Sequence, residues 1–526
     1  SQGTPLYIAV REARERLQGL EHQFPCASWL PLICQHPATI PPSWQDFLEP
    51  SPEPAPTTRS PQGNARKALL ASVASAVLVT GLRLLGVMQP LELAAFDHMM
   101  QLRPPEPPDS RLLIIGIDDE DLRFQRQQED LGNVSISNRN LAKLLPLIKQ
   151  YQPRAIGLDV YRDANTPSTY PALIQQLKTN DHLIAICKAG YDKTNPYGIA
   201  PPPEIPPDSY RVGFSDFVSD SDQTLRRHLL SMNSQWSDKS LCKATFAFNV
   251  ELALRYLQPY LDGEQTGVNP AWDDQFKFTL QKSPDALTNV PHGFVQSPDW
   301  DIAKTVIPSL QTRSGGYQLI DSRGKQILLN YRASRNLEDI AVQKPLRFFL
   351  AHSNPSGSQE LKSLIQGKIV LIGVTAKEKG DYHRTPYARN SQDLTPGIVV
   401  HAHMLSQLLG AVLDGRPLLW VWSPWIDGIW IAGWSAIAGL LAWAMGRYNR
   451  LSQFSWVGWG IAVSITAGVI YGICLGCLVL FAGWLPFVPA VATAMTTMVT
   501  ILIVTMKPQQ RLSKSLFNWS KENETL

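Results

Sequence analysis

The sequence lacks any run or stripe of basic residues that would suit a nucleic acid. Its 48 Lys and Arg residues nearly balance its 45 Asp and Glu residues, and the formal net charge is only +3 at pH 7. Because binding to phosphates requires clustered Lys and Arg, this balance argues against nucleic acid as the main partner.

Charge itself is almost missing from residues 419–506, whereas residues 90–418 have the mixed composition of a soluble protein. At 526 residues the chain is too long for a single domain and leaves room for two or three units. We therefore expect one large folded domain beside a membrane region that contacts lipid.

Four segments are apolar enough to cross a membrane as helices: 67–89, 424–445, 455–480 and 485–506. The last two share a stretch too long for one span of about 20 residues, and the residues from Gly483 to Pro486 offer a turn between them. A cleaved signal peptide is the alternative for the first segment. However, such a peptide has a shorter core nearer the N-terminus, so an uncleaved anchor is favoured.

Basic residues predict the orientation of these spans. They flank the spans at three places: Arg66 and Lys67 before the first, Arg447 and Arg450 between the second and third, and Lys507, Arg511 and Lys514 after the fourth. All three groups lie on the cytoplasmic side if both termini are cytoplasmic, as the excess of Lys and Arg on that side requires. The sequence thus predicts a multi-pass protein of the plasma (inner) membrane, with residues 90–418 extracytoplasmic and a cytoplasmic tail at 507–526.

The first residues look like the end of another domain. Residues 5–19 have helical apolar spacing, and 26–37 form an apolar run suited to a buried strand. One helix and one strand cannot bury a core alone. Because the chain also opens with Ser1, we expect segment 1–48 to be the last piece of an α/β domain of a longer protein. Residues 49–66 read as a Pro- and Ser-rich linker.

The string AVREARERLQGLEHQFPCASWLPLICQHP in this segment resembles the closing helix and strand of the CHAT family, caspase-like cysteine protease domains often found in cyanobacterial multidomain proteins. The resemblance implies that the catalytic His and Cys lie in an upstream part. Cys26 and Cys34 match no nucleophile position and are interpreted as packing residues. We therefore expect no enzymatic activity in this chain.

Three apolar runs in the region 90–418 share one design, since each ends at an acidic residue or loop. They are 112–117 followed by Asp118 and Asp119, 155–158 followed by Asp159, and 369–373 followed by a loop with Asp381. Residues 141–151 between the first two runs read as a helix, and strand–helix–strand order predicts a parallel pair. We expect an α/β fold, a mostly parallel sheet with flanking helices, joined to the four-span helical region.

Ligands of open α/β sheets bind outside the carboxyl ends of the strands, where these acidic residues fall. Asp118, Asp119, Asp159 and Asp381 are therefore candidate ligand-binding residues, together with His383, which alternates with Asp381 in a loop. Facing carboxylates can bind a divalent cation or a cationic ligand. The alternative is that these side chains only cap helices and shape turns. No cofactor is predicted.

Cys187 and Cys242 are the two cysteines of the region 90–418. An extracytoplasmic, oxidising compartment lets such a pair form a disulfide. Closing the loop between them would stabilise the domain by roughly 4 kcal/mol. Two buried thiols are the alternative, because the sequence does not show that the residues lie close.

The order of motifs in this region resembles the second class of the CHASE families, extracellular sensory domains of bacterial receptors. The matching stretches are LELAAFDHMMQLRP, LLIIGIDDEDL, PRAIGLDVYRD, VGFSDFVSDSDQTLRRHLL, ILLNYRAS and GKIVLIGVTAKEKGDYHRTPY with TPGIVVHAHMLSQLL. The family also has three helices after the domain. The resemblance implies a membrane receptor in signal transduction that detects an unidentified extracytoplasmic ligand and passes the signal to the N-terminal caspase-like module.

Two other functions remain open from the sequence. The acidic residues could serve an extracytoplasmic metal-dependent hydrolase with its metal at Asp118 and Asp159, or the chain could be a structural scaffold. Homodimerisation is a further hypothesis, since receptors often signal through paired helices.

Overall fold

The computed structural model describes residues 6–25, 61–128, 134–190, 195–206, 210–232, 239–261, 300–302, 305–352, 359–390, 392–448 and 455–503. The predicted strand at 26–37 with Cys26 and Cys34, residues 49–60 of the predicted linker and the tail 507–526 lie outside these residues. Residues 61–66 of that linker instead belong to the helix α3 (Pro61–Leu84). The chain divides into two units, residues 1–68 and 69–526. In the first unit, the predicted amphipathic helix is present as α1 (Leu6–Gln18).

The second unit is built on a six-stranded sheet in which every neighbouring pair is parallel. The strand order is β4-β3-β2-β10-β1-β9. The strands are β1 (Leu112–Ile117), β2 (Ala155–Asp159), β3 (Leu183–Cys187), β4 (Val212–Phe214), β9 (Val342–Pro345) and β10 (Ile369–Val374). The three predicted strands are thus the centre of the sheet, with β10 between β1 and β2.

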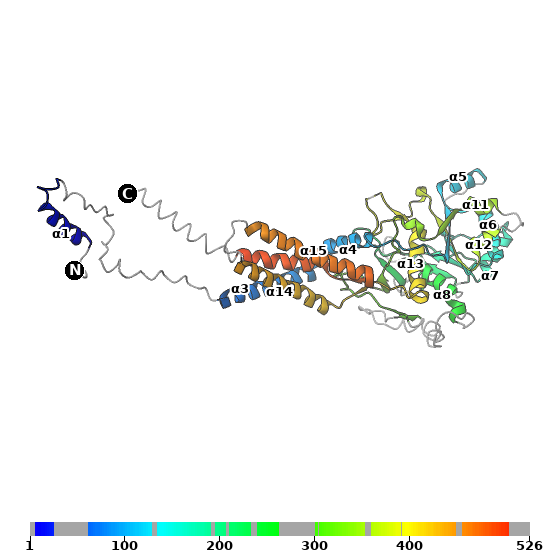
Figure 1. Cartoon of the computed structure of the whole chain (residues 1–526). Helices are drawn as coiled ribbons and strands as arrows, with labels where there is room; N and C mark the ends of the chain where they lie inside the picture. Colours follow the sequence, from blue (N-terminus) through cyan, green and yellow to red (C-terminus); the bar gives the residue numbers. More distant parts are fainter. Residues whose placement is uncertain are drawn as a thin grey trace. The chain divides into compact units, whose positions relative to one another are not determined.

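Apart from Asp159 at the end of β2, the central strands are apolar because both faces of the sheet are covered by helices. Every residue of β1 and of β10 is buried. The helices on one face are α8 (Phe248–Leu261) and α13 (Gly397–Leu413). Those on the other face are α5 (Asp119–Gln128), α6 (Asn138–Gln150), α7 (Pro171–Thr179), α11 (Leu346–Ala351) and α12 (Gln359–Ile365), as Figure 1 shows. The predicted mostly parallel sheet with flanking helices is confirmed.

Shorter strands and 3-10 turns lie outside this sheet and its flanking helices. They are the antiparallel pairs β5 (Arg227–Ser231) with β8 (Lys325–Leu328), β6 (Trp300–Ile302) with β7 (Thr305–Ile307) and β11 (Tyr382–His383) with β12 (Thr395–Pro396), and the 3-10 turns η3 (Leu337–Ile340) and η4 (Lys377–Lys379). The β11–β12 pair follows β10 and η4 and leads directly into α13, so it lies at the carboxyl edge of the sheet.

The membrane region consists of long apolar helices. The described residues hold three helices long and apolar enough to cross a membrane, with apolar stretches Ala65–Leu84, Pro424–Met445 and Val457–Phe481. They belong to α3 (Pro61–Leu84), α14 (Pro424–Tyr448) and α15 (Ser455–Phe481). Three of the four predicted spans are therefore helices of spanning length. In place of the fourth, the described residues contain a shorter apolar helix, Phe487–Ile503.

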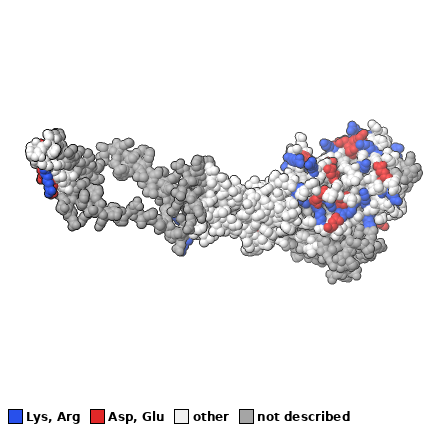
Figure 2. Space-filling model, viewed as in Figure 1, with Lys and Arg blue, Asp and Glu red and all other residues white. Residues whose placement is uncertain are grey.

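Two further elements connect these helices to the sheet domain. Helix α4 (Gln89–Gln101) follows α3 after a short break, and β13 (Trp420–Val421) pairs in parallel with β14 (Gly483–Trp484). On the face drawn in Figure 2, the helical region carries almost no charged side chains, whereas the α/β domain carries both signs intermixed. This contrast is the one that the sequence predicts between a membrane region and a soluble domain.

Candidate functional site

The four predicted carboxylates separate into two groups. Asp118, at the end of β1, accepts two hydrogen bonds from Arg347 Nη1, at 2.8 and 2.7 Å, and a third from the backbone N–H of Asp121 at 2.8 Å. Burial opposes ionisation, but the bonds from Arg347 hold the pKa of Asp118 below its ordinary value. Asp119 accepts hydrogen bonds from the backbone amides of Lys377 and Glu378 at 3.3 and 3.2 Å. Both carboxylates are engaged by the protein itself.

Asp159 and Asp381 form the second group, together with two histidines. Asp159 ends β2, Asp381 follows η4, His383 lies in β11 and His401 lies in α13. His383 Nε2 is 3.1 Å from Asp381 Oδ1, and His401 Nε2 is 4.0 Å from Asp159 Oδ1. The side chains of Asp381 and His383 are 45% and 28% exposed, whereas those of Asp159 and His401 are only 8% and 3% exposed. The group therefore runs from solvent into the interior.

A chain of hydrogen bonds fixes the orientation of His401. The side-chain amide of Asn249 donates from Nδ2 to His401 Nδ1 at 3.3 Å, and its Oδ1 accepts from His228 Nε2 at 2.8 Å. Burial lowers the pKa of His401 to about 3, so the ring is neutral. Since Nδ1 accepts a hydrogen bond, we assign the proton to Nε2, the nitrogen that faces Asp159.

The electrostatics of the two carboxylates differ. Burial, and then the neighbouring charge of Asp381, raise the pKa of Asp159 well above its ordinary value. Asp381 is also partly buried, yet its hydrogen bond with His383 holds its pKa below the ordinary value. Asp159 accepts no hydrogen bond from any described residue. One carboxylate of the pair thus has a partner, while the more deeply buried one lacks a counter-charge.

Side chains from the neighbouring strand ends complete the site. Phe217, shortly after β4, packs its ring against His383 and His401 with centroids 4.7 and 4.5 Å apart. Asp216 Oδ2 accepts the backbone N–H of Ala189 at 2.9 Å, while its Oδ1 is buried without a hydrogen bond from the described residues. Burial raises the pKa of Asp216 to about 6. Strands β2, β4 and β10 therefore bring polar groups to one carboxyl edge, as expected of an open parallel sheet.

Cys187 and Cys242 form a disulfide bond in the structure, with Cα atoms 5.4 Å apart. Cys187 ends β3, and its carbonyl accepts the backbone N–H of Ser215 at 3.0 Å. The bridge thus ties the segment before α8 to the strand end beside Asp216.

Several residues of this site were not predicted as ligand-binding. They are His401, Asp216 and Phe217. The apolar residues that follow His401 in MLSQLLGAVL indicate a helix, but they do not show what that helix packs against. Phe217 had no signal beyond its place next to Asp216 in SDFVSDSD.

Among the described residues, no group of three or more His, Cys, Asp or Glu side chains is placed to hold a metal ion. The metal-dependent hydrolase considered from the sequence placed its metal at Asp118 and Asp159. In the structure, Asp118 is bound by Arg347 and Asp159 belongs to the other group. This alternative therefore has no structural support.

A family model for the CHASE2 domain matches residues 74–440. No curated protein and no solved structure matches the chain. The match covers the sheet domain, the site at its carboxyl edge and the adjoining parts of helices α3 and α14. The chain belongs to the CHASE2 family, whose members are extracellular sensory domains, and is a membrane protein with an extracytoplasmic sensor domain.

Proposed function

We propose that this chain is a transmembrane receptor whose extracytoplasmic domain detects a stimulus at the carboxyl edge of its sheet and signals through its helices to an N-terminal, caspase-like CHAT module. The observation that carries the proposal is a set of direct contacts between the sheet domain and the ends of the apolar helices. These contacts give a change in the domain a route to the membrane region.

The first contact joins two membrane helices to a loop of the sensor domain. Arg83 in α3 forms an ion pair with Asp427 in α14 at 2.5 Å and also donates to the carbonyl of Gly315 at 2.8 Å. Both side chains are buried, with exposures of 9% and 2%. Since a charge in an apolar helix is costly without a partner, this triple contact fixes the relative position of the three segments.

The second contact joins α4 to the start of the last described helix. Glu92 accepts the backbone N–H groups of Phe487 and Val488 at 3.0 and 2.7 Å. A carboxylate at this position satisfies amides that a helix leaves unpaired at its N-terminus, and it interacts favourably with the helix dipole. Because Glu92 is bound to these amides, a shift of α4 would also displace the start of the helix Phe487–Ile503.

The third contact is the fully buried ring of Trp484, which lies in the loop between α15 and the last helix. Its centroid is 4.4 Å from that of Phe96 in α4 and 5.7 Å from that of Tyr317 in the sensor domain. The backbone of Gly483 and Trp484 pairs with β13, which leads into α14. The aromatic cluster around Trp484 thus connects α4, the sensor domain and the segment between the last two helices.

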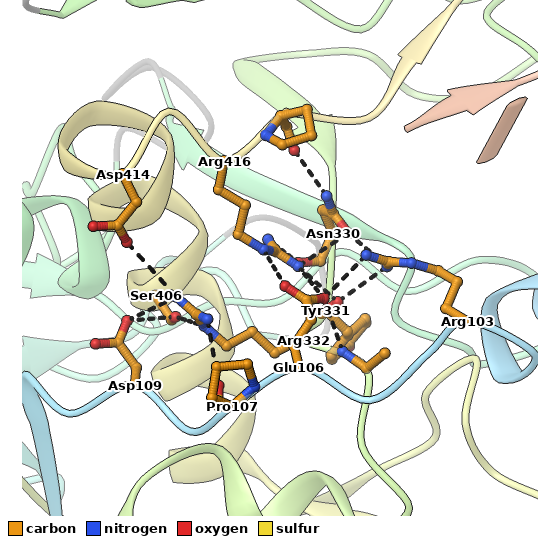
Figure 3. Close-up of polar contacts among 12 residues, drawn as sticks. Arg103, Glu106, Pro107, Asp109, Asn330, Tyr331, Arg332, Ser406, Asp414 and Arg416 are labelled. Carbon is orange, nitrogen blue, oxygen red and sulfur yellow. Dashed lines mark hydrogen bonds and ion pairs between the residues drawn. The ribbon is translucent and has the colours of Figure 1, made fainter. Parts of the chain in front are cut away.

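A fourth contact region links the segments through which the chain enters and leaves the domain (Figure 3). Glu106, after α4, binds Arg416, before β13, through bonds of 2.7 and 2.9 Å. Asp109 accepts from Ser406 in α13 at 2.6 Å. Arg332, in the segment after β8, donates to the same serine at 2.8 Å and joins that segment to the network. Because α13 also carries His401, this network lies on a direct path from the candidate site to α14.

The proposal includes the fourth span predicted at 485–506, of which the structure describes the helix Phe487–Ile503. An even number of spans puts both termini on one side, which agrees with the basic residues that flank the apolar segments. Signalling then requires only that the ligand prefer one of two arrangements of the helices, because a ligand shifts an equilibrium by its difference in affinity for the two states.

Alkaline phosphatase fusions test this topology. The enzyme is active only outside the cytoplasm, so fusions that end after residues 418 and 484 are expected to be active, and fusions after residues 450 and 526 inactive. Activity at 526 would show an odd number of spans. Inactivity at 418 would place the sensor domain in the cytoplasm and overturn the receptor proposal.

A further inference from the structure

We propose that the edge site around Asp159 binds a small organic amine that carries an oxygen acceptor close to its ammonium group. The ammonium would contact Asp159 and Asp381, and the oxygen would accept from His401. This inference rests on the receptor proposal and deepens it by naming the chemical class of the stimulus.

The first observation is the state of Asp159. Its side chain is 92% buried, since its exposure is 8%, yet no described residue donates a hydrogen bond to it. A buried carboxylate without a partner is costly, and proteins retain such groups where a ligand or a reaction uses them. The raised pKa of Asp159, caused by burial and by Asp381, agrees with a missing counter-charge.

The second and independent observation is His401, which is 3% exposed and is aimed at the same place. With its Nδ1 occupied by Asn249, its Nε2 carries the proton and has no acceptor within hydrogen-bond distance among the described residues. The 4.0 Å between His401 Nε2 and Asp159 Oδ1 is too long for a hydrogen bond. Ligand atoms placed within about 3 Å of each group would supply the hydrogen bonds that both groups lack.

A donor and an acceptor therefore face the same place without partners. An ammonium group can satisfy Asp159 but not His401, because it only donates. An oxygen on the same ligand can satisfy His401. A ligand that carries both groups on neighbouring carbons can bind both Asp159 and His401. A plain alkylammonium or a plain alcohol can satisfy only one of these two side chains.

Charge and ligand chemistry argue against purely anionic ligands and divalent metals. The site holds three acidic side chains, Asp159, Asp216 and Asp381, and one basic side chain, Lys188, whose charge acts on Asp216 and Asp381, so it favours ligands with a positively charged group. A divalent metal is disfavoured, because the described residues offer no group of three or more His, Cys, Asp or Glu ligands. The partly exposed Asp381 and His383 mark the side from which a ligand would enter.

Isothermal titration calorimetry on the full chain in lipid nanodiscs tests the inference with defined probes. The probes are ethanolamine, glycine, ethylamine, ethylene glycol, and the chlorides of Mg²⁺ and Ca²⁺. We expect ethanolamine or glycine to bind at least fivefold more tightly than ethylamine, because a single hydrogen bond contributes on the order of 1 kcal/mol. Ethylene glycol and the metal ions are expected to give no heat of binding.

Three variants assign the binding to the site. Asp159→Asn is expected to weaken amine binding at least tenfold, and Asp163→Asn, an exposed acid just beyond the end of the same strand, is expected to leave it unchanged. His401→Phe is expected to abolish the preference for ethanolamine or glycine over ethylamine. Circular dichroism of each variant checks that it is folded. If Asp159→Asn is misfolded, Asp381→Asn replaces it with the same tenfold expectation.

Absence of binding by every amine at 10 mM, equal binding of ethylene glycol, binding of the metal ions alone, or unchanged affinity in folded Asp159→Asn would each overturn the inference. These outcomes are separate from the fate of the receptor proposal. A chain with the expected phosphatase pattern that binds none of the amines refutes the amine site alone.

Discussion

Arg226 ties α4 to the sensor domain, and its removal is the sharpest test of how the helices are coupled to that domain. Its side chain is 1% exposed and binds Asp97 in α4 through Nε at 2.7 Å and Nη2 at 2.6 Å. It also binds Asp220 at 2.8 Å and Asp222 at 3.0 and 2.7 Å. Arg226→Ala would leave these three carboxylates without their shared partner.

The cost depends on what each carboxylate retains. Asp222 is 48% exposed, so water takes over much of its interaction. Asp220 keeps Arg227 at 2.9 Å and the hydroxyl of Tyr317 at 2.7 Å. Asp97 is 19% exposed and is the carboxylate for which the loss is greatest. Breaking a buried ion pair costs about 3–5 kcal/mol, and these compensations favour the lower value, about 3 kcal/mol.

The assay is thermal unfolding of the chain in detergent, followed by tryptophan fluorescence. At about 2 °C per kcal/mol for a large domain, Arg226→Ala should lower Tm by about 6 °C. The control is Arg126→Ala, which breaks the surface pair of Arg126 with Glu378, whose side chains are 41% and 46% exposed. That change should lower Tm by no more than about 2 °C.

Asp97→Asn, added to Arg226→Ala, should recover part of the lost Tm, because it removes the charge left without a partner. Equal shifts for Arg226→Ala and Arg126→Ala, or no recovery in the double variant, would refute the reasoning that a buried network holds α4 to the domain.

Three further predictions concern stability. Burial raises the pKa of Glu251 to about 8, so its ionisation destabilises the fold as pH rises from 4.5 towards 8. Glu251→Gln should therefore have the same Tm as the wild type at pH 4 and a higher Tm at pH 8.5, where its free energy of unfolding should be larger by roughly 3–5 kcal/mol. A difference in Tm between the variant and the wild type that stays constant from pH 4 to pH 8.5 would contradict the assignment. Arg83→Leu should lower Tm in nanodiscs, because it leaves Asp427 buried without its partner. The double variant Arg83→Leu with Asp427→Leu should restore most of the lost Tm. A lower Tm in the double variant than in Arg83→Leu would show that the ion pair is stabilising in itself. The double change of Cys187 and Cys242 to Ser, which opens a loop of 55 residues, should cost roughly 4 kcal/mol, and mass analysis of non-reduced peptides that finds two free thiols would remove the basis for this expectation.

The centre of the sheet could be predicted because its strands are covered on both faces. β1 and β10 read as unbroken apolar runs, and the acidic residues that follow them mark their carboxyl ends. The edge strands gave no such signal. β9 is the sequence VQKP with a largely unburied pattern, and β4 has only 3 residues. Short strands at the edge of a sheet lack the length and the periodicity on which a prediction depends.

The candidate site could be predicted only in part, because the separation of the four carboxylates into two groups depends on contacts between residues far apart in the sequence. Asp118 and Asp159 look alike in the sequence, since each ends an apolar strand. Arg347, 229 residues after Asp118, satisfies the first carboxylate, and no comparable cation reaches Asp159 among the described residues. His401 belongs to the site because α13 packs against β10, which a helical pattern alone does not indicate.

The pairing of β13 with β14 has a consequence for engineering. The chain that leaves the sensor domain at Trp420 hydrogen-bonds to Ala482, which belongs to the hairpin between the last two helices. A chimera that exchanges only the sequence between α3 and α14 would place a foreign Trp420 segment against the original hairpin. Functional domain exchanges should therefore carry residues up to 488 as one cassette, with the downstream seam inside the last helix rather than at the apparent domain border.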